Sequence, residues 1–334
     1  MLRPFIDAHV HLNTPTLEKL KMAKDLDAYF VSINTEIPFF ISLKEQEKTI
    51  HKLNEFDKRI AFITSFETKN INEDNWSDRA IQQIKTGLDH GARAVKIWKN
   101  IGMDASLKDR EGNFIMVDHP KLMPIYQYLS DNDILLIGHQ GEPRNCWLPL
   151  EKMTVDSDRN YFSEHPEYHM YKNPEYPSYE EQMKARDNVL EKFPKMKYVG
   201  LHLFSMEYDI EEVAKRLDKY PNTKTDLAER ICHIQLQAKN DPEKVRDFFI
   251  KYQDRIIYGT DVIDDGSFTA KEATERLKYL WNYHWKFFST SQTMEAEEFK
   301  GTFKGLELPE KVLTKIFRDN AIETYRLDKE LLTY

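Results

Sequence analysis

The chain has 334 residues, of which 40% are hydrophobic and 31% charged, a composition typical of globular proteins and a length that one large α/β barrel can reach. Its formal net charge of −8 argues against nucleic acid or an anionic membrane as the main partner, because both attract basic surfaces. No apolar run approaches the ~20 residues of a membrane-spanning helix, and no signal peptide is recognisable before the first expected strand.

Short apolar runs separated by stretches of helical periodicity recur along the chain, as in repeated βα units. In chain order, we expect strands at 5–11, 28–34, 60–67, 92–98, 134–139, 198–203, 223–227 and 256–261. Helices are expected at 43–57, 77–90, 119–132, 210–220 and 241–252, with two more, 269–288 and 308–327, after the last strand. This alternation predicts a (β/α)8 TIM barrel that forms a single domain over residues 1–334, and we expect the last helix to cover its outside.

The first expected strand, FIDAHVH at residues 5–11, carries two histidines one residue apart. Side chains alternate between the two faces of a strand, so His9 and His11 point to one side and Val10 to the other. Two neutral imidazole rings on one face can bind a single cation, but such a pair also arises often by chance.

Three further candidate ligands, His139, His202 and Asp261, stand at the ends of later expected strands. The carboxyl ends of barrel strands form the active-site face, so these side chains should meet the two early histidines there. Imidazole nitrogens with a carboxylate oxygen suit a divalent metal, zinc best of all, and leave one position for water. Such a metal lowers the pKa of its bound water toward ~7. We expect Asp261 to position this water or take its proton, as well as to bind the metal.

The connection between the fifth and sixth expected strands, residues 140–197, is far too long for a simple turn. Long loops in compact domains are usually functional lids or disordered inserts. This segment is rich in tyrosine, tryptophan and proline, whereas disordered segments contain few aromatic residues. We therefore expect a folded lid over the site.

Several short motifs together resemble the amidohydrolase superfamily, most closely its amidohydrolase-2 (amidohydrolase-related) branch. The resemblance covers essentially the whole chain and rests on IDAHVH at 6–11, the histidine strand ends at 138–139 and 201–202, GTD at 259–261, and NAIETY at 320–325. It implies a metal held by His9, His11, His139 and Asp261, with His202 nearby as a ligand or polarising group. The branch includes hydrolases, lactonases and nonoxidative decarboxylases of carboxylated rings.

Lys96 ends the fourth expected strand, where binuclear members of the superfamily carry a carbamylated lysine that bridges two metals. A bridge here would draw His139 and His202 to a second ion. The alternative is an unmodified lysine that binds a substrate anion or forms an ion pair. The sequence predicts one metal ion, or two if Lys96 is carbamylated.

Four residues near the expected barrel mouth are candidates for binding substrate. Arg144 and Arg230 carry guanidinium groups, which recognise carboxylate or phosphate with two hydrogen bonds. Glu142 lies beside the first of these arginines, and Trp98 could stack against a ring. Packing within the lid is the competing interpretation of each. Asp226, on the seventh strand, could orient a ligand imidazole. We expect no catalytic role for the histidines at 51, 90, 119, 165, 169, 233 and 284.

The leading functional hypothesis is a hydrolase that uses a metal-activated water against the carbonyl of a small polar molecule, anionic or sugar-derived. Asp261 and His202 would transfer protons and polarise the carbonyl. A decarboxylase of a carboxylated ring and a non-catalytic ligand-binding barrel are the alternatives.

Cys146 and Cys232 form no disulfide framework, so we expect a reducing, cytoplasmic location. A small molecule is the expected partner, and the sequence leaves a homo-oligomer open.

Overall fold

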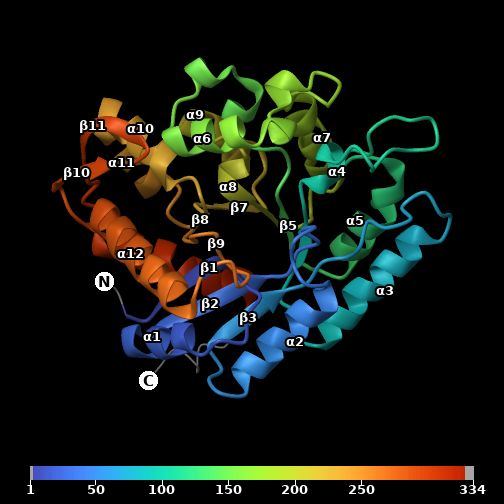
Figure 1. The fold of residues 1–334 in the computed structure, drawn as a ribbon, viewed down its shortest axis with the longest axis horizontal. Helices are drawn as coiled ribbons and strands as arrows, with labels where there is room; N and C mark the ends of the chain where they lie inside the picture. Colours follow the sequence, from blue (N-terminus) through green and yellow to red (C-terminus); the bar gives the residue numbers. More distant parts are fainter. Residues whose placement is uncertain (1–2, 328–334) are drawn as a thin grey trace.

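The computed structural model describes residues 3–327 and contains the expected barrel (Figure 1). Its strands are β1 (Phe5–Leu12), β2 (Ala28–Ile33), β3 (Ile60–Ile63), β4 (Val95–Ile97), β5 (Leu136–Gly138), β6 (Tyr198–Gly200), β7 (Thr223–Asp226) and β8 (Ile256–Ile257). The hydrogen-bonded neighbours among them run parallel. Most are shorter than expected: β4 and β5 begin later than the apolar runs, and β3, β6 and β8 end earlier.

Two seams join the sheets β3-β2-β1-β9 and β4-β5-β6-β7-β8 into a closed barrel. At the first seam, Thr64 follows β3 and pairs in parallel with Val95 of β4. At the second seam, Ala8 N donates to Tyr258 O at 3.0 Å, which places the end of β8 beside β1. The (β/α)8 fold predicted from the sequence is confirmed.

Only the first two residues of the expected eighth strand, 256–261, form β8, and a division separates them from a second short strand that lies beyond the expected bounds. β8 pairs with β7, whereas β9 (Val262–Asp264) pairs with the last residues of β1. Asp261 lies at this division in the left-handed backbone region, with a φ of 63°. The division occurs because the chain changes its pairing partner at the barrel mouth.

Helices surround the strands, as Figure 1 shows. Six of them match expected helices: α2 (Leu43–Asn54), α3 (Trp76–Asp89), α5 (Met123–Asp131), α9 (Ile210–Lys219), α11 (Pro242–Lys251) and α12 (Ala270–Ser289). Two that the sequence analysis did not predict are α1 (Glu18–Leu26) and α10 (Ile231–Asn240). In α10, buried polar residues such as His233 and Gln235 conceal the apolar periodicity that marks a helix.

The C-terminal helical stretch consists of α13 (Glu310–Thr314), a π-helical turn (Lys315–Asp319) and α14 (Asn320–Tyr325). The expectation that it covers the outside of the barrel is wrong for α14. Ala321, Ile322 and Tyr325 pack with the inward-facing side chains of the strands, among them Ile6. This helix therefore closes the amino-terminal end of the barrel. Asn320 holds it there, because Asn320 Nδ2 donates to the carbonyls of Gln253 and Ile256, each at 2.7 Å.

The long connection after β5 is folded and contains α6 (Asp156–Glu164), short 3-10 turns and α7 (Tyr179–Lys192). Its first part has a small core of its own, made by Cys146, Met153, Phe162 and Met170. The buried side chains of α7 instead join the main core around the barrel. We call residues 144–172 the lid. It contacts the segment after β6, because Arg144 N donates to Glu207 Oε1 at 2.8 Å.

A hairpin that the sequence analysis did not predict, β10 (Thr293–Ala296) and β11 (Phe299–Lys304), lies next to the lid. Its Glu298 accepts a backbone hydrogen bond from Asp156 at 2.7 Å.

Within residues 3–327, no helix combines the length and the apolar character that crossing a bilayer requires.

Candidate active site

A β-bulge in β1 directs the two early histidines into the barrel. The step from Asp7 to Val10 in β1 lies opposite the shorter step from Phe30 to Ser32 in β2. Ala8 consequently packs in the interior core and Val10 in the outer core, although the two residues are two positions apart. A bulge inserts one residue and reverses the alternation of side chains. His9 and His11 therefore face the interior at the strand's carboxyl end.

Gly259 allows the chain after β8 to pass close to β1. A methyl group at this position would lie 2.7 Å from the Cβ of His9 and 3.1 Å from its backbone nitrogen. We expect Gly259→Ala to lower the free energy of unfolding by about 1–3 kcal/mol, as overpacking does in other cores, and to weaken metal binding because His9 must move. Thermal unfolding and metal titration measure the two effects. An unchanged Tm would contradict this account of the close approach.

Asp7 fixes the segment that carries Asp261. Its two carboxylate oxygens accept from Thr260 N at 2.9 Å, Thr260 Oγ1 at 2.7 Å and Trp281 Nε1 at 2.8 Å. Burial raises the pKa of Asp7 to about 6, although these hydrogen bonds act in the opposite direction. The aspartate of the IDAHVH motif thus joins β1, the segment after β8 and α12 behind the site.

Asp261 lies among the imidazole rings. Its Oδ1 is 3.1 Å from His9 Nε2 and 3.2 Å from His11 Nε2, and its Oδ2 is 3.8 Å from His202 Nε2. The ring of His139 lies 4.1 Å from that of His202, measured between centroids. The structure therefore brings together all five residues that the sequence singled out.

His202 belongs to a turn of left-handed helix. His202, Leu203, Phe204 and Ser205 all have φ between 54° and 58°. In a left-handed helix each non-glycine residue costs roughly 1–2 kcal/mol, so neighbouring groups must stabilise the turn. The turn begins directly after β6, and it places the imidazole of His202 beside Asp261.

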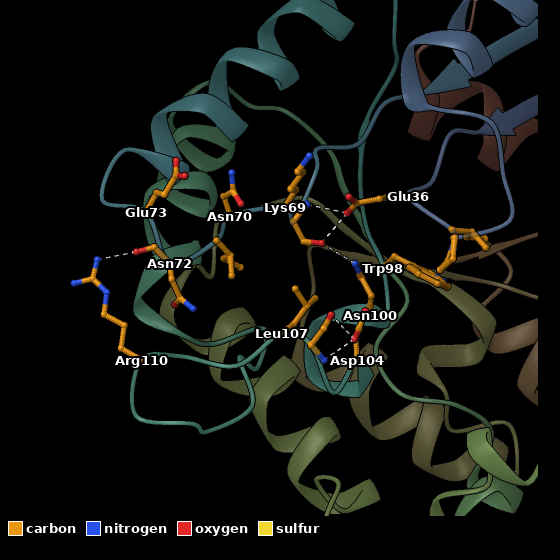
Figure 2. Close-up of a pocket in the computed structure, with 15 residues that line it drawn as sticks. Glu36, Lys69, Asn70, Asn72, Glu73, Trp98, Asn100, Asp104, Leu107 and Arg110 are labelled. Carbon is orange, nitrogen blue, oxygen red and sulfur yellow. Dashed lines mark hydrogen bonds between the residues drawn. The ribbon is translucent and has the colours of Figure 1, made fainter.

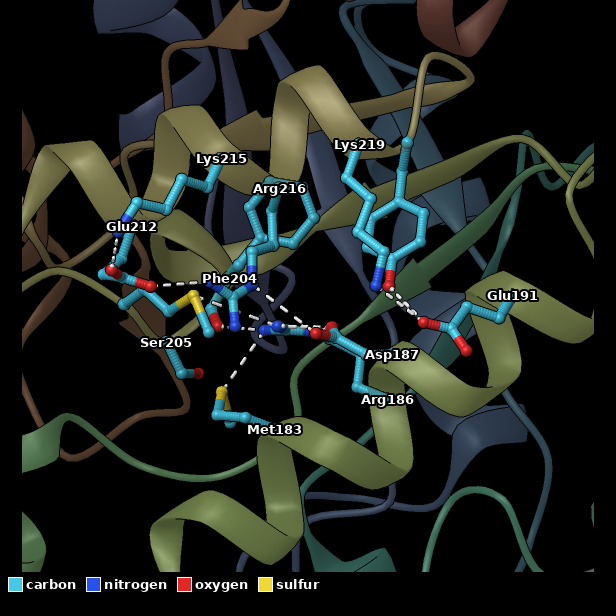
Figure 3. Close-up of polar contacts among 12 residues, drawn as sticks. Met183, Arg186, Asp187, Glu191, Phe204, Ser205, Glu212, Lys215, Arg216 and Lys219 are labelled. Carbon is cyan, nitrogen blue, oxygen red and sulfur yellow. Dashed lines mark hydrogen bonds and ion pairs between the residues drawn. The ribbon is translucent and has the colours of Figure 1, made fainter.

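Two side chains of α7 hold this turn, and Figure 3 shows the surroundings of one of them, Arg186. The buried guanidinium of Arg186 donates to the Phe204 carbonyl and lies 5.4 Å from the centre of the Phe204 ring. Tyr179 Oη donates to the Ser205 carbonyl at 2.7 Å. Asp187 anchors Arg186 from the other side at 2.7 Å. Sequence reasoning missed this support, because it treated the whole connection 140–197, α7 included, as a lid.

Asp226 orients two of the histidines. Its Oδ2 accepts from His9 Nδ1 at 2.6 Å, and its Oδ1 accepts from the backbone nitrogen of His202 at 2.5 Å. A carboxylate can only accept here, so Nδ1 of His9 carries the hydrogen and Nε2 is the atom directed to the site. His202 Nδ1 similarly donates to the Ala228 carbonyl at 2.9 Å, which leaves its Nε2 free of hydrogen in the neutral ring.

Replacing Asp226 by asparagine is expected to weaken metal affinity about 10–100-fold, the usual loss when the hydrogen-bond partner of a metal-binding histidine is removed. Equilibrium dialysis against a buffered zinc series measures the change. Asp247→Asn, on the exposed face of α11, is the matched control and should bind zinc as the wild type does. Equal affinities of the two variants would contradict the role of Asp226.

Electrostatics at the site suit a cation. Burial lowers the pKa of His139 and His202 well below the usual range, so both rings are neutral. Burial opposes the ionisation of Asp261, but His9 and the other rings hold its pKa well below the ordinary value. Burial also opposes the charging of His9, yet Asp261 and Asp226 raise its pKa to about 9.

The donor set fits a divalent metal. Several buried atoms here have no hydrogen-bond partner among residues 3–327: Nε2 of His9, His139 and His202, Nδ1 of His11, and Oδ1 of Asp261. Buried polar atoms are normally paired, so such a group requires an explanation. His9, His202 and Asp261 each offer one ligand atom, and these three atoms lie within 4.8 Å of one another. That group includes His202, which the sequence assigned first to catalysis. The individual ligand assignments stay predictions.

Lys96 is buried on β4 beside these residues. Burial lowers the pKa of its amine to about 8, even though Asp261 and Asp226 oppose that shift. A lysine with a lowered pKa has a larger neutral fraction, and only the neutral amine can be carbamylated. Its position is compatible with both functions considered for it, and the second metal stays a prediction.

Comparison with known proteins identifies the family. A family model described as Amidohydrolase, the Amidohydro_2 model, matches residues 72–327. The chain belongs to the amidohydrolase family, in its amidohydrolase-2 branch. No curated protein matches its sequence significantly.

Solved structures show the same fold at low sequence identity. An uncharacterised TIM-barrel protein from Bordetella bronchiseptica has a TM-score of 0.52 and 15% identity, covering 97% of this chain and 99% of that one. A putative amidohydrolase from Staphylococcus aureus has a TM-score of 0.54 and 11% identity, covering 97% and 99%. A 2,6-dihydroxybenzoate decarboxylase, complexed with 2,6-dihydroxybenzoate, has a TM-score of 0.54 and 10% identity, covering 98% and 100%. At these identities the likeness shows the fold alone.

The amidohydrolase places its two candidate substrate arginines differently. Arg230 is buried at the start of α10, and its Nε has no hydrogen-bond partner within the described residues. It lies close enough to His139 and His202 to lower their pKa values. Arg144 instead pairs with Glu180 at 3.3 Å and lies 5.0 Å from the ring centres of both Tyr179 and Tyr208.

The other two candidates line the barrel mouth. Glu142 is buried and forms an ion pair with Lys99. Trp98 is half-buried and comes directly after β4. Sequence reasoning missed Glu207, which is buried after the turn of His202 and has one carboxylate oxygen without a partner among residues 3–327. It also expected nothing of His233, which lies buried 3.4 Å from Asp158 of the lid. Neither residue stands in a motif that could have revealed it.

Proposed function

We propose that this amidohydrolase is a metal-dependent hydrolase that cleaves an ester, lactone or amide bond in a small anionic molecule. The observation that carries the proposal is the carboxylate of Asp261, surrounded by imidazole rings whose buried nitrogens lack hydrogen-bond partners. A divalent metal, best matched by zinc and held by His9, His11, His139 and Asp261, would supply a polarised carbonyl and a water molecule acidic enough to react near neutral pH.

The residues of the chain then have separate tasks. Asp261 is ionised and can accept a proton at Oδ2, the oxygen that faces His202. His202 is neutral, and its Nδ1 is already committed to the Ala228 carbonyl, so Nε2 can bind a cation or accept a proton. In this protonation state it cannot donate a hydrogen bond to a carbonyl from Nε2. We therefore favour ligand or base over polarising group for His202.

Arg230 supports an anionic substrate. It is a buried cation next to the site. Its Nη1 donates to the Glu229 carbonyl at 3.3 Å and lies 3.5 Å from the Glu229 carboxylate, whereas its Nε has no hydrogen-bond partner within residues 3–327. A hydrogen bond to a charged group contributes about 1.5–3 kcal/mol, so Arg230→Met should raise KM for an anionic substrate by roughly 10–150-fold. Arg144→Met is the control, because that guanidinium already has Glu180 and two tyrosine rings as partners. Equal KM changes in the two variants would contradict the assignment.

A decarboxylase is the second candidate, because the same arginine could hold a carboxylate that leaves as carbon dioxide. The 2,6-dihydroxybenzoate decarboxylase shares the fold.

Both cysteines are free thiols, which supports our proposal of a reducing, cytoplasmic location.

Product analysis in 18O-labelled water distinguishes the candidates. The metal-loaded protein is incubated with small lactones, esters and amides that carry a carboxylate, and with hydroxylated benzoates. Hydrolysis incorporates one 18O into the product acid, as we expect. Release of carbon dioxide without incorporation would replace the hydrolase with the decarboxylase. If neither occurs, and His11→Ala and Asp261→Asn bind ligands as the wild type does, the protein is a non-catalytic binding barrel.

A further inference from the structure

A cavity of about 740 Å³ lies at the barrel mouth, between the segments that follow β2, β3 and β4. We call it the β2–β4 cavity. In the view of Figure 2, Glu36 and Trp98 are at one end, and Glu73 and Arg110 are at the other. Ligand pockets in proteins typically have volumes of about 300–1,000 Å³, so this cavity has room for a complete small-molecule group.

The cavity lies near the metal-site residues on two sides, although none of them lines it. Trp98 comes directly after β4, so this wall of the cavity continues along the chain from the strand that carries Lys96. The second wall contains Ile37 and Pro38, and the same loop continues to Phe40. The ring of Phe40 lies 5.2 Å from that of His11. A substrate held at the metal-site residues can therefore extend into the cavity.

The lining mixes polar and apolar side chains and includes two exposed cations, Arg110 at the outer end and Lys69 beside Glu36 (Figure 2). Arg110 is exposed and already donates to Asp74 at 3.0 Å and to the Asn72 carbonyl at 2.9 Å. Glu36 and Asp104 are half-buried, and no ion pair forms at either carboxylate within residues 3–327. Two carboxylates without cationic partners repel an anionic ligand.

The remaining groups suit hydroxyls. Glu36 Oε2 accepts from Thr68 N and Thr68 Oγ1, each at 2.8 Å, which fixes the carboxylate in place. The buried Asn100 donates to Thr68 Oγ1 at 3.2 Å and so stiffens the same wall. Asn70, Asn72 and Ser106 add amide and hydroxyl groups. The half-buried indole of Trp98 offers an apolar face against which a ring can stack.

We propose that the β2–β4 cavity is the subsite for the part of the substrate remote from the cleaved bond, and that this part is a hydroxyl-rich, uncharged ring. The inference rests on the proposed function, because it makes the occupant of the cavity a portion of the substrate. The anionic group lies at Arg230, on the other side of the metal-site residues, and the hydroxylated ring lies against Trp98 and Glu36.

The first test measures binding without catalysis, by ligand-observed NMR on the purified protein. The probes are methyl β-D-glucopyranoside, glucuronate and cyclohexylmethanol, which share a six-membered ring and differ in charge or hydroxyl content. We expect the glucoside to bind at least tenfold more tightly than either of the others. Equal or tighter binding of glucuronate or of cyclohexylmethanol, or no binding of the glucoside, would overturn the proposal.

Variants place the probe in the cavity. Trp98→Ala and Glu36→Gln should each weaken glucoside binding at least fivefold, whereas Trp98→Phe, which keeps an aromatic face, should restore most of it. Glu55→Gln, at the exposed end of α2, is the control for Glu36→Gln and should change nothing. Unchanged binding in Glu36→Gln and Trp98→Ala, with Tm values equal to the wild type, would show that the glucoside binds elsewhere.

The outcome is separable from that of the proposed function. Labelled-water hydrolysis tests the reaction, and the NMR titration tests the cavity. Glucoside binding that depends on Trp98, in a protein that hydrolyses nothing, would refute the hydrolase and retain the ring specificity of the cavity. Hydrolysis without selective glucoside binding would retain the hydrolase and refute the subsite.

Discussion

Asp261→Asn is expected to remove most of the bound metal and to lower the rate of hydrolysis more than ~100-fold. Even the loss of a hydrogen-bond partner behind a metal-binding histidine lowers metal affinity or activity about 10–100-fold. The carboxylate is the negative group among the rings, at 3.1 Å from His9 Nε2 and 3.2 Å from His11 Nε2. Asparagine keeps the size of the side chain and one acceptor oxygen but removes the charge, so cation binding loses its main electrostatic support.

Metal content by mass spectrometry and turnover of the substrate found in labelled water are the two measurements for this variant. Asp265→Asn is the matched control, because Asp265 is in the same segment and accepts local hydrogen bonds from Ser267, including one from Ser267 N at 3.0 Å. Full metal content and activity in Asp261→Asn would show that the histidines alone form the site.

Arg186→Met is expected to reduce turnover by about 10- to 100-fold. The effect would act through the position of His202 and not through a contact of Arg186 with substrate, because a misplacement of a catalytic group by about 1 Å can cost 100-fold. The variant leaves the buried Phe204 carbonyl without the guanidinium that now donates to it. An unsatisfied buried group costs about 1–3 kcal/mol, which adds to the strain of the left-handed turn. The turn should then relax toward ordinary backbone angles and displace the imidazole of His202.

Three comparisons separate this effect from a general loss of stability. Arg216→Met is the control, since Arg216 also pairs with Asp187, at 3.5 Å (Figure 3), but forms no hydrogen bond with residues 202–205 in the described part of the chain. Arg186→Lys keeps one donor and should recover part of the activity. Turnover is measured at a temperature where Tm shows every variant to be fully folded. If Arg186→Met loses only Tm and keeps turnover, the arginine supports the fold and not the position of His202.

Much of the site could be predicted from local patterns. The apolar runs located the strands because buried parallel strands read as continuous hydrophobic segments. Once the alternation of strands and helices indicated a barrel, the carboxyl-end rule brought His139, His202 and Asp261 to the same face as His9 and His11. The structure places them within contact of one another.

Features that depend on distant partners could not be predicted in this way. Nothing in residues 320–325 indicates that α14 enters the amino-terminal end of the barrel, since that requires a cavity formed by several strands. Likewise, the four left-handed residues after β6 are stabilised by Arg186 and Tyr179, which precede them by about twenty residues and belong to another helix. The β2–β4 cavity arises only where three loops meet.

The sequence by itself determined that His9 and His11 share one side of a strand, because they are two residues apart. It did not determine which side. Strict alternation from Ile6, which packs in the interior, would have turned both imidazoles outward. The bulge between Asp7 and Val10 reverses that alternation, and its pairing with β2 exists only in the folded sheet. The tertiary structure thus decided that the two rings face Asp261 inside the barrel.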